Sequence, residues 1–242
     1  MKKFFQISFV LIVAVAFVFL SWKSSDTYKG IKCQDVGIQV DEESGIRFLN
    51  KEMIAEMLLE KQDSLQGKRY EDINIYLLEE FLNAHPNIDK AELYLTINGE
   101  LCVDVKQRKP LVRVFELDES YYLDSNFDQF SLSNVFSARV LQVYWSETTE
   151  ARKESLRLLM KRIESDAFLK AQITAVEFDE NDDLMVYPRV GNHKIILGSS
   201  KDLDSKFEKL KVFYSQGLEK VGWDRYSHIN LKFENQIVCT KR

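Results

Sequence analysis

An apolar run at the N-terminus restricts the fold and location of this chain more than any other sequence feature. From Phe4 to Leu20 only Gln6 and Ser8 interrupt the run, and Trp22 extends it to nineteen residues. Nineteen helical residues span about 28 Å, which nearly matches a bilayer hydrocarbon core of about 30 Å. The sequence therefore predicts a transmembrane helix that contains Phe4, Phe5, Leu11, Val15, Leu20 and Trp22.

The residues flanking this run predict its orientation. Lys2 and Lys3 favour a cytoplasmic N-terminus, and Trp22-Lys23 suits the opposite membrane interface. A cleaved signal peptide is the main alternative, but the small-x-small pattern at 14–16 lies inside the run. A buried helix of a soluble protein fits less well, because the run is apolar on every side. Under both membrane-targeted interpretations the remaining chain lies outside the cytoplasm, and we expect at most one span.

The composition of the 242-residue chain predicts one large or two small globular domains. Apolar residues make up 45% and charged residues 29%, which is ordinary for globular proteins. A net charge of −5 provides no basic field for nucleic acid. The three His argue against a multi-His metal enzyme, and the nine Gly give little support for a Gly-rich nucleotide-binding fold.

The residues after a short polar linker at 24–30 predict a compact α+β unit. Residues 36–40 alternate between apolar and polar or small side chains, as in a half-buried strand. Asn50 is a suitable N-cap for a first helix, and a second helix with a wide apolar face is expected to start near Asn74. Pro86 is expected to end the second helix.

A β-hairpin is expected next, and its apolar alternation predicts the register. Asn98-Gly99 first suggests a two-residue turn, but that turn would place Leu95 opposite Cys102. A three-residue loop with Gly99 in the left-handed conformation places Leu95 opposite Leu101 instead. One sheet face is then uniformly apolar, as a one-sided sheet requires. The predicted order over residues 31–109 is strand, helix, helix, strand, strand.

Pro110 marks a boundary, after which the pattern predicts a mixed β-sheet domain with two helices. Strands are expected at residues 111–117, 121–124, 140–145, 173–178, 184–188, 194–197, 226–233 and 236–240. Helices are expected at about 149–164 and 201–216, and Gly217 is expected to end the second one. The predicted fold class of the whole chain is therefore α+β with an N-terminal transmembrane helix.

No sequence motif predicts catalysis, a cofactor or a metal site. The chain lacks the motifs of nucleophilic hydrolases, zinc proteases and P-loop proteins. Residues 179–183 begin like a calcium loop, but Leu184 and Val190 stand where Gly and Glu are needed, which favours a solvated turn. His85, His193 and His228 are each interpreted as structural residues.

Cys33 and Cys102 are both out of phase with the inward-facing residues of their strands. Both thiols are therefore predicted on the uncovered face of the sheet. If the two strands are parallel neighbours, a disulfide is geometrically possible. The alternative is two unpaired small residues, and Cys239 is expected to remain free in either case.

Several short motifs, in this order after one apolar run, resemble a bacterial protein family. Residues 86–91 resemble the family's helix end and the entry into its next strand, residues 98–105 resemble its hairpin, and residues 107–113 resemble the exit from its last strand. Residues 121–124 resemble the start of its β domain, and residues 188–198 resemble a later strand found especially in Bacteroidetes-like members. Gln107 stands where the family usually has an acidic residue. The family is that of the cell division protein FtsQ (DivIB), whose first extracytoplasmic domain is a POTRA domain with β-α-α-β-β order.

The resemblance implies a non-catalytic scaffold of the division apparatus. It assigns residues 1–23 to a cytoplasmic tip and membrane anchor, 24–30 to a linker, 31–109 to the POTRA domain and 110–242 to an FtsQ-type β domain. The implied partners are FtsB (DivIC)-like and FtsL-like bitopic division proteins, together with other divisome proteins, and no cofactor is implied. The implied location is the inner membrane at the septum, with both domains in the periplasm.

The expected main partner surface is the end of the β domain. Residues 226–233 and 236–240 should form its last strands and accept a strand from an FtsB-like partner. The chain stops two residues after Thr240, so we expect no later element to cover that edge. The expected contact residues are Trp223, Tyr226, Ile229, Leu231, Phe233, Ile237 and Val238, of which Ile229, Leu231 and Phe233 should also face the core. The alternative is that all of them only complete the core.

A second partner surface is expected along the edge strand at residues 92–97, through Glu92, Tyr94 and Thr96. Charges at the start of this strand also fit a shielded edge. Two other function classes are the alternatives to the scaffold interpretation. A POTRA module of an outer-membrane assembly or secretion system would need a long series of barrel strands, and an anchored periplasmic hydrolase would need a catalytic motif.

Overall fold

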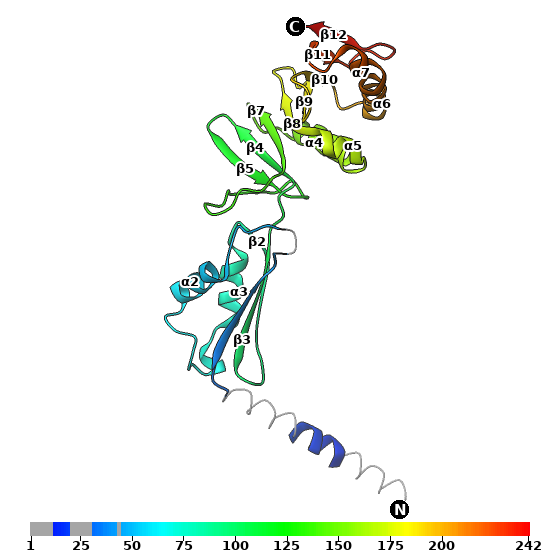
Figure 1. The fold of residues 1–242 in the computed structure, drawn as a ribbon. Coiled ribbons are helices and arrows are strands. Elements are labelled where there is room, and N and C mark those ends of the chain that lie inside the picture. Colours follow the sequence, from blue (N-terminus) through cyan, green and yellow to red (C-terminus); the bar gives the residue numbers. More distant parts are fainter. Residues whose placement is uncertain (1–11, 20–30, 43–44) are drawn as a thin grey trace, which may run out of the picture. The chain divides into compact units, whose positions relative to one another are not determined.

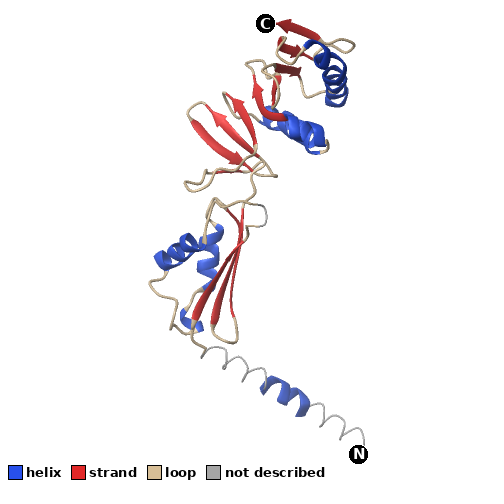
Figure 2. Cartoon of the chain, viewed as in Figure 1, coloured by secondary structure: helices blue, strands red, loops and turns tan. Residues whose placement is uncertain are grey.

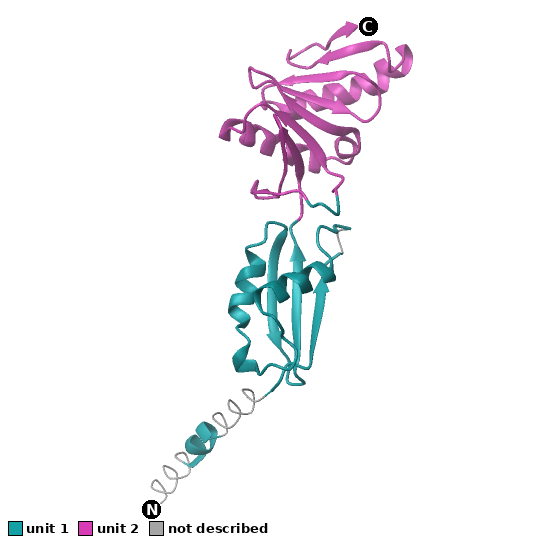
Figure 3. Ribbon diagram, turned by 90° about the vertical axis from the view of Figure 1, so that its left-hand side faces the viewer, with its two compact units in different colours: residues 1–108, 133–136 teal, residues 109–132, 137–242 magenta. Residues whose placement is uncertain are grey.

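The computed structural model describes residues 12–19, 31–42 and 45–242, and it divides into two compact units (Figure 3). Unit 1 contains the chain up to Arg108 together with Ser133–Phe136. Unit 2 contains Lys109–Leu132 and Ser137–Arg242. Each unit has its own β-sheet and its own buried apolar residues.

Part of the predicted transmembrane segment falls within the described residues. Residues 12–19, which include Val15, are helical and exposed. Phe4, Phe5, Leu11, Leu20 and Trp22 lie outside the described residues. None of the helices in the described part of the chain has both the length and the apolar character needed to cross a bilayer. The transmembrane helix therefore stays a prediction.

Unit 1 has the predicted β-α-α-β-β order (Figure 1). Its elements are β1 (Asp35–Val40), α2 (Lys51–Lys61), the 3₁₀ turn η1 (Tyr70–Asp72), α3 (Ile75–Asn83), β2 (Ile88–Leu95) and β3 (Glu100–Gln107). The predicted cap is confirmed, because the side chain of Asn50 accepts a hydrogen bond from the amide of Met53 at 2.8 Å. The side chain of Asn74 likewise caps α3 and accepts from the amide of Leu77 at 3.0 Å.

The sheet of unit 1 has the strand order β1-β3-β2, with β1 parallel and β2 antiparallel to β3. Leu95 pairs with Leu101, and Gly99 has φ +82°, which confirms the predicted three-residue loop. The apolar side of this sheet packs against both helices (Figure 2). Its buried residues include Ile54 and Leu58 of α2, Leu78 and Leu82 of α3, Leu93 of β2, and Leu101, Val103 and Val105 of β3.

Gln107, at the end of β3, is buried and links three backbone groups of unit 1. Its Oε1 accepts a hydrogen bond from the amide of Leu49 at 2.9 Å. Its Nε2 donates to the carbonyl oxygens of Asp41 at 2.9 Å and Ile46 at 3.1 Å. A carboxylate at this position could accept but could not donate. This chemistry explains why an amide stands where the resembled family usually has an acid.

The segment Ser133–Phe136 belongs to unit 1 because it packs on the loop before α2. The hydroxyl of Ser133 donates to the carbonyl of Phe48 at 3.0 Å. The ring of Phe136 lies edge-on to that of Phe48, with 5.5 Å between centroids. Val135 remains 62% exposed at this end of the unit.

Unit 2 is built on a nine-stranded mixed sheet (Figure 1). Its strands are β4 (Val112–Glu116), β5 (Glu119–Leu123), β6 (Gln129–Phe130), β7 (Leu141–Trp145), β8 (Ile173–Phe178), β9 (Leu184–Pro188), β10 (Lys194–Gly198), β11 (Tyr226–Asn230) and β12 (Val238–Lys241). Their order in the sheet is β12-β11-β10-β9-β8-β7-β4-β5-β6. The two-residue strand β6 lies at one edge and β12 at the other.

Helices cover one face of this sheet (Figure 2). They are α4 (Glu150–Glu164), α5 (Ala167–Gln172), α6 (Leu203–Phe213), a π turn η2 (Tyr214–Leu218) and α7 (Glu219–Val221). Leu156 and Leu159 of α4 and Phe207 and Leu210 of α6 pack on the inward-facing residues of the strands. The opposite strand face carries half-buried or exposed residues such as Arg113 and Tyr144.

Gly217 does not end the second long helix, so that prediction was wrong. The helix continues through the π turn, in which Gly217 lies against the ring of Phe213, and the helical path stops at Gly222 with φ +91°. The left-handed C-terminal position is thus five residues later than expected. A π turn adds one residue to the helical repeat, which the 3.6-residue pattern used for the prediction does not include.

Candidate partner-binding edge

The candidate site is the outer edge of β12. β12 pairs antiparallel with β11, with Asn230 opposite Val238 and His228 opposite Thr240. Within the described residues no strand pairs with the other side of β12. Ile237 and Cys239 pack against the core of unit 2, whereas Val238 is 43% exposed. The edge therefore combines unpaired backbone with at least one accessible apolar side chain.

The chain reversal before β12 is held by a lysine that the sequence analysis missed. Lys209 of α6 donates through Nζ to the carbonyl of Phe233, and also to those of Leu231 at 3.4 Å and Glu234 at 3.2 Å. Backbone carbonyls that end a strand need such donors when no strand supplies them. Lys209 thereby fixes the turn that directs the chain into β12.

The end of β12 is also tied to its surroundings. The amide of Arg242 donates to the carbonyl of Arg225 at 3.2 Å, and its guanidinium donates to the carbonyl of Asn192. The hydroxyl of Ser227 in β11 donates to the carbonyl of Thr240 at 3.2 Å. These contacts all lie on the β11 side or at the end of the strand. They order β12 without occupying its outer edge.

The seven predicted contact residues divide into three groups. Ile229 and Leu231 are fully buried, which confirms that they face the core and leaves them no exposed surface for a contact role. Phe233 does not face the core, because β11 ends at Asn230 and the alternation stops there; its side chain is 46% exposed in the turn. Trp223, Tyr226 and Ile237 are half-buried, and Val238 is exposed.

Trp223 and Tyr226 pack on the helical layer while keeping part of their surface accessible. The Trp223 ring lies edge-on to the Tyr214 ring, with 4.9 Å between the ring centroids. The ring centroids of Tyr226 and Phe213 lie 6.0 Å apart. Trp223 also lines a surface cavity with Phe168 and Tyr214. These aromatic residues fix the position of the segment that precedes β11.

His193 belongs to the same aromatic cluster and is structural. It is 2% exposed, and its Nε2 lies 2.7 Å from the hydroxyl of Tyr214. Burial lowers the pKa of His193 below its ordinary value, and the positive charge of Arg242 adds to this effect. The imidazole is therefore neutral at pH 7, as expected for a histidine that packs in a core.

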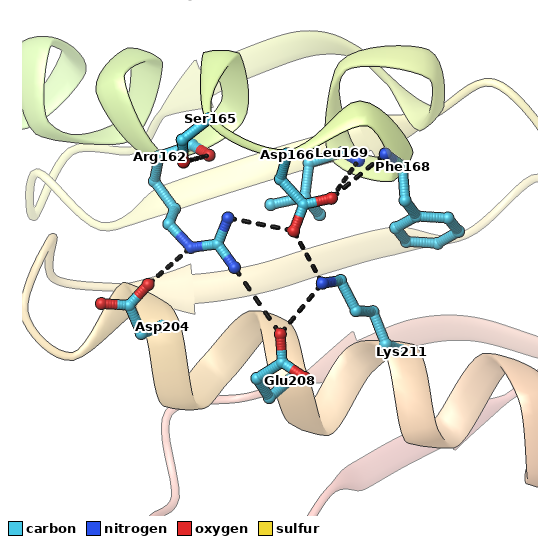
Figure 4. A network of polar contacts seen from close by, with 8 residues as sticks. All are labelled: Arg162, Ser165, Asp166, Phe168, Leu169, Asp204, Glu208 and Lys211. Atoms are coloured by element: carbon cyan, nitrogen blue, oxygen red, sulfur yellow. Dashed lines mark hydrogen bonds and ion pairs between the residues drawn. The ribbon is translucent and has the colours of Figure 1, made fainter.

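An ion-pair network joins the helices that support this end of the sheet (Figure 4). Asp166, the N-cap of α5, lies 3.1 Å from Arg162 of α4 and 2.6 Å from Lys211 of α6. Glu208 lies 2.9 Å from Lys211, and Asp204 lies 2.6 Å from Arg162. The hydrogen bond from Lys211, together with those from Arg162 and the Leu169 amide, lowers the pKa of Asp166 to about 2. The i,i+4 spacing of Arg162 and Asp166 and the i,i+3 spacing of Glu208 and Lys211 are the parts of this network that the sequence could indicate.

The second predicted surface lies on β2, the edge strand of unit 1, but its edge is largely occupied. The side chain of Asn83 accepts a hydrogen bond from the amide of Ala91 at 2.8 Å and donates to its carbonyl at 3.1 Å. Glu79 accepts from the amide of Leu93 at 3.2 Å. Two outward-facing amides of β2 are thus already satisfied from α3, which favours the shielded-edge alternative.

The residues named for that surface have partners inside unit 1. The amide of Thr96 donates to the carbonyl of Glu100 at 2.8 Å, so it closes the hairpin and does not face outward. Glu92 pairs with Lys90. The hydroxyl of Tyr94 donates to Asp104 at 3.3 Å on the open face of the sheet.

The predicted Cys33–Cys102 disulfide is wrong in this structure, because the two thiols lie on opposite faces. Cys33 precedes β1, is 1% exposed, and its thiol donates to the carbonyl of Asp35 at 3.4 Å. Cys102 is opposite Gly37 in β3, on the open face beside Tyr94. The alternation of side chains between the two sheet faces begins only at Asp35, so it does not predict the direction of the Cys33 side chain. Cys33, Cys102 and Cys239 are all free.

Among the residues that the structure describes, no group of His, Cys, Asp or Glu side chains has the arrangement of a metal site. Residues 179–183 form a turn in which the carboxylate of Asp179 accepts hydrogen bonds from the amides of Asn181 at 2.8 Å and Asp183 at 2.9 Å. Asp182 pairs with the buried Arg152 at 2.6 Å. The local carboxylates therefore stabilise the β8–β9 turn.

Comparison with protein-family models identifies both units. A POTRA-like domain model matches residues 31–106, and a model described as FtsQ/DivIB, C-terminal related, matches residues 109–240. No curated protein matches the chain. The second match argues against a module of an outer-membrane assembly system, because the region after the POTRA-like domain is of FtsQ/DivIB type.

Domains of these two types are non-enzymatic scaffolds, and together they fit a scaffold role among the proteins of the divisome. The FtsQ/DivIB match alone covers more than half of the 242 residues. The chain therefore belongs to the FtsQ/DivIB family of cell-division proteins.

Proposed function

We propose that the protein links septal division proteins by accepting a β-strand from an FtsB (DivIC)-like partner at the outer edge of β12, with an FtsL-like protein held in the same complex. The unpaired edge of β12 carries this proposal. Strand addition derives affinity from main-chain hydrogen bonds and specificity from alternate side chains. An edge that the described residues leave open can provide both.

The contrast between the two edge strands supports β12 over β2. The amides of Ala91 and Leu93 in β2 are hydrogen-bonded to side chains of α3. Among the described residues, no side chain from outside the β11–β12 pair hydrogen-bonds to the backbone of Val238, Cys239 or Thr240. A partner strand at β12 therefore displaces only water, whereas one at β2 must first break internal hydrogen bonds.

The exposed apolar residues define the side chains that a partner would meet. Val238 lies on the edge strand itself, and Phe233 lies in the turn before it. Trp223 and Tyr226 are half-buried aromatic residues, a type that often dominates interface energies. A partner strand that pairs with β12 and places an apolar side chain on Val238 would match this edge.

Capture of the FtsB-like partner by the full-length protein tests the proposal. Val238→Asp places a charge at the edge and should weaken capture at least about tenfold, equivalent to about 1.4 kcal/mol. Removal of all residues after Glu234 should abolish capture. Val212→Asp is the matched control, because Val212 is a 52% exposed valine on α6. Equal capture by the wild type, Val238→Asp and the truncated chain, with unchanged melting of unit 1, would show that the partner docks elsewhere.

We further propose that residues 4–22 are retained as a single membrane anchor, with the N-terminus in the cytoplasm and both units in the periplasm at the division septum. The near-spanning length of the run and the Trp22-Lys23 pair after it support this proposal. Intact-mass measurement of the membrane-extracted protein should give the uncleaved chain. A mature N-terminus near Phe17 would identify the run as a signal peptide instead.

A further inference from the structure

Four large apolar side chains are exposed at one end of unit 1. Ile97, in the β2–β3 loop, is 70% exposed, and Tyr76, at the start of α3, is 76% exposed. Leu77 is 47% exposed and Tyr70, in η1, is 40% exposed. We call these four residues the apolar tip. None of them contributes to the core of unit 1, so packing within the unit does not account for them.

Hydrogen bonds place the four residues at the same end of the unit. Asn83 contacts Ala91, and Glu79 contacts Leu93, so α3 runs antiparallel to β2. The N-terminal turn of α3, with Tyr76 and Leu77, therefore lies toward the hairpin loop that carries Ile97. Figure 1 shows η1 and this loop at the end of unit 1 where β1 begins.

The same end receives the chain from the predicted membrane anchor. The amide of Tyr70 donates to the carbonyl of Ile31 at 2.9 Å, and the amide of Gln34 donates to the carbonyl of Gly99 at 2.7 Å. Eight residues separate Trp22 from Ile31. Even fully extended, eight residues reach only about 28 Å. The anchor therefore keeps this end of unit 1 close to the bilayer.

We propose that the apolar tip inserts into the headgroup region of the bilayer and so fixes unit 1 on the membrane surface. Tyrosine suits this region because its ring is apolar and its hydroxyl is polar. Exposed apolar residues that gather on one surface mark an interaction site. A tethered surface needs little intrinsic affinity, because the anchor raises its effective concentration at the membrane.

The charges around the apolar tip indicate which lipids it prefers. Among the described residues, the neighbouring charged residues are three cations and four anions, namely Lys32, Lys68, Arg69, Asp35, Glu71, Asp72 and Glu100. Arg69 and Glu71 lie 3.3 Å apart and neutralise each other. With no excess of positive charge, attraction to anionic lipids cannot drive the contact. Insertion should therefore depend on apolar area and be similar in zwitterionic and anionic bilayers.

A matched pair of probe positions within unit 1 tests this inference. In the full-length protein, Cys102→Ser and Cys239→Ser first remove the two half-buried thiols, whereas Cys33 is buried and stays. Into this background Ile97→Cys or Tyr76→Cys is introduced, and the new thiol is labelled with an environment-sensitive fluorophore. Val135→Cys is the control, because Val135 is an equally exposed apolar residue beside Phe48, near the opposite end of β3. The protein is placed in phosphatidylcholine nanodiscs, with and without phosphatidylglycerol, that contain spin-labelled quencher lipids.

Quenching at positions 97 and 76 should exceed that at 135 at least about twofold, in both lipid compositions, as expected of apolar insertion at the interface. Equal quenching at all three positions would overturn the inference, and so would quenching that requires anionic lipid. A blue shift at position 97 that appears only on adding the FtsB-like partner would identify a protein as the occupant and would also overturn it.

The inference rests on the proposed anchor, but its failure can be distinguished from that of the proposed function. If the chain does not enter the nanodiscs, both the anchor and the tip contact are wrong. If it enters and shows no selective quenching, only the tip contact is wrong. Partner capture through β12, measured on unlabelled protein with Cys239 intact, reports separately on the proposed scaffold function.

Discussion

At the scale of single residues, the side-chain amide of Gln107 holds the loop between β1 and α2 against the end of β3. It accepts one hydrogen bond and donates two, and all three partners are backbone groups of the loop between β1 and α2. No other uncharged side chain except asparagine has this combination of donors and acceptor. The residue was notable in the sequence only as a departure from an acidic pattern, and its bonding became evident only in three dimensions.

Gln107→Glu should therefore lower the free energy of unfolding by about 2–4 kcal/mol at pH 7, because it removes both donors and buries a charge. Protonation of the new carboxyl restores one donor, and burial raises the pKa of that carboxyl above its ordinary value, so the loss should become smaller as the pH falls from 7 to 5. Urea unfolding of the wild type and the variant at pH 7 and pH 5 measures both effects. Gln216→Glu, at an exposed helical position, is the control and should change little. An equal effect of both substitutions would contradict this role of Gln107.

At the scale of secondary-structure elements, the Asp166 network explains how α4, α5 and α6 are fixed relative to one another. Asp166 caps α5 through the amides of Phe168 at 3.1 Å and Leu169 at 3.3 Å, and its other oxygen binds Arg162 and Lys211 (Figure 4). Because α6 also carries Lys209, the network supports the turn before β12 indirectly.

The pH dependence of stability tests this network. Since the folded-state pKa of Asp166 is about 2 and its unfolded value is about 3.9, its stabilising effect is complete above about pH 4 and is lost as the pH falls through 2. Asp166→Asn keeps a capping oxygen but has no charge. The variant should lose less stability than the wild type between pH 4 and pH 2 in urea unfolding. Asp204→Asn, with an 88% exposed side chain, should follow the wild type. Parallel profiles for wild type and Asp166→Asn would contradict the assignment.

The predictable elements are those whose signal is local. The hairpin register followed from the requirement that Leu95 and Leu101 share one face, and the Asn50 cap followed from its position before an apolar helix. The errors occurred where regular patterns stop. Phe233 lies beyond the end of β11, and Cys33 lies before the start of β1.

At the scale of the whole molecule, the sequence was sufficient for the family and for the order of the longer elements in both units, because these depend on patterns spread over many residues. It did not predict the short elements β6, α5 and α7 of unit 2. The candidate site was only partly predictable. Val238 was correctly placed on the last strand, whereas Ile229 and Leu231 belong to the core. Lys209 could not be found, because its contacts with Leu231, Phe233 and Glu234 join segments more than twenty residues apart.

Amide hydrogen exchange of the full-length protein, with and without its FtsB-like partner, tests the central claim most directly. A strand added at β12 would place the outward-facing backbone amides among Val238–Lys241 in new hydrogen bonds and slow their exchange, whereas the alternate amides already face β11. The amides of Ala91 and Leu93, already bonded to Asn83 and Glu79, should not change. Slower exchange in β12 with an unchanged β2 is the predicted result. Protection of β2 or of another surface, with β12 exchanging as in the free protein, would contradict the account.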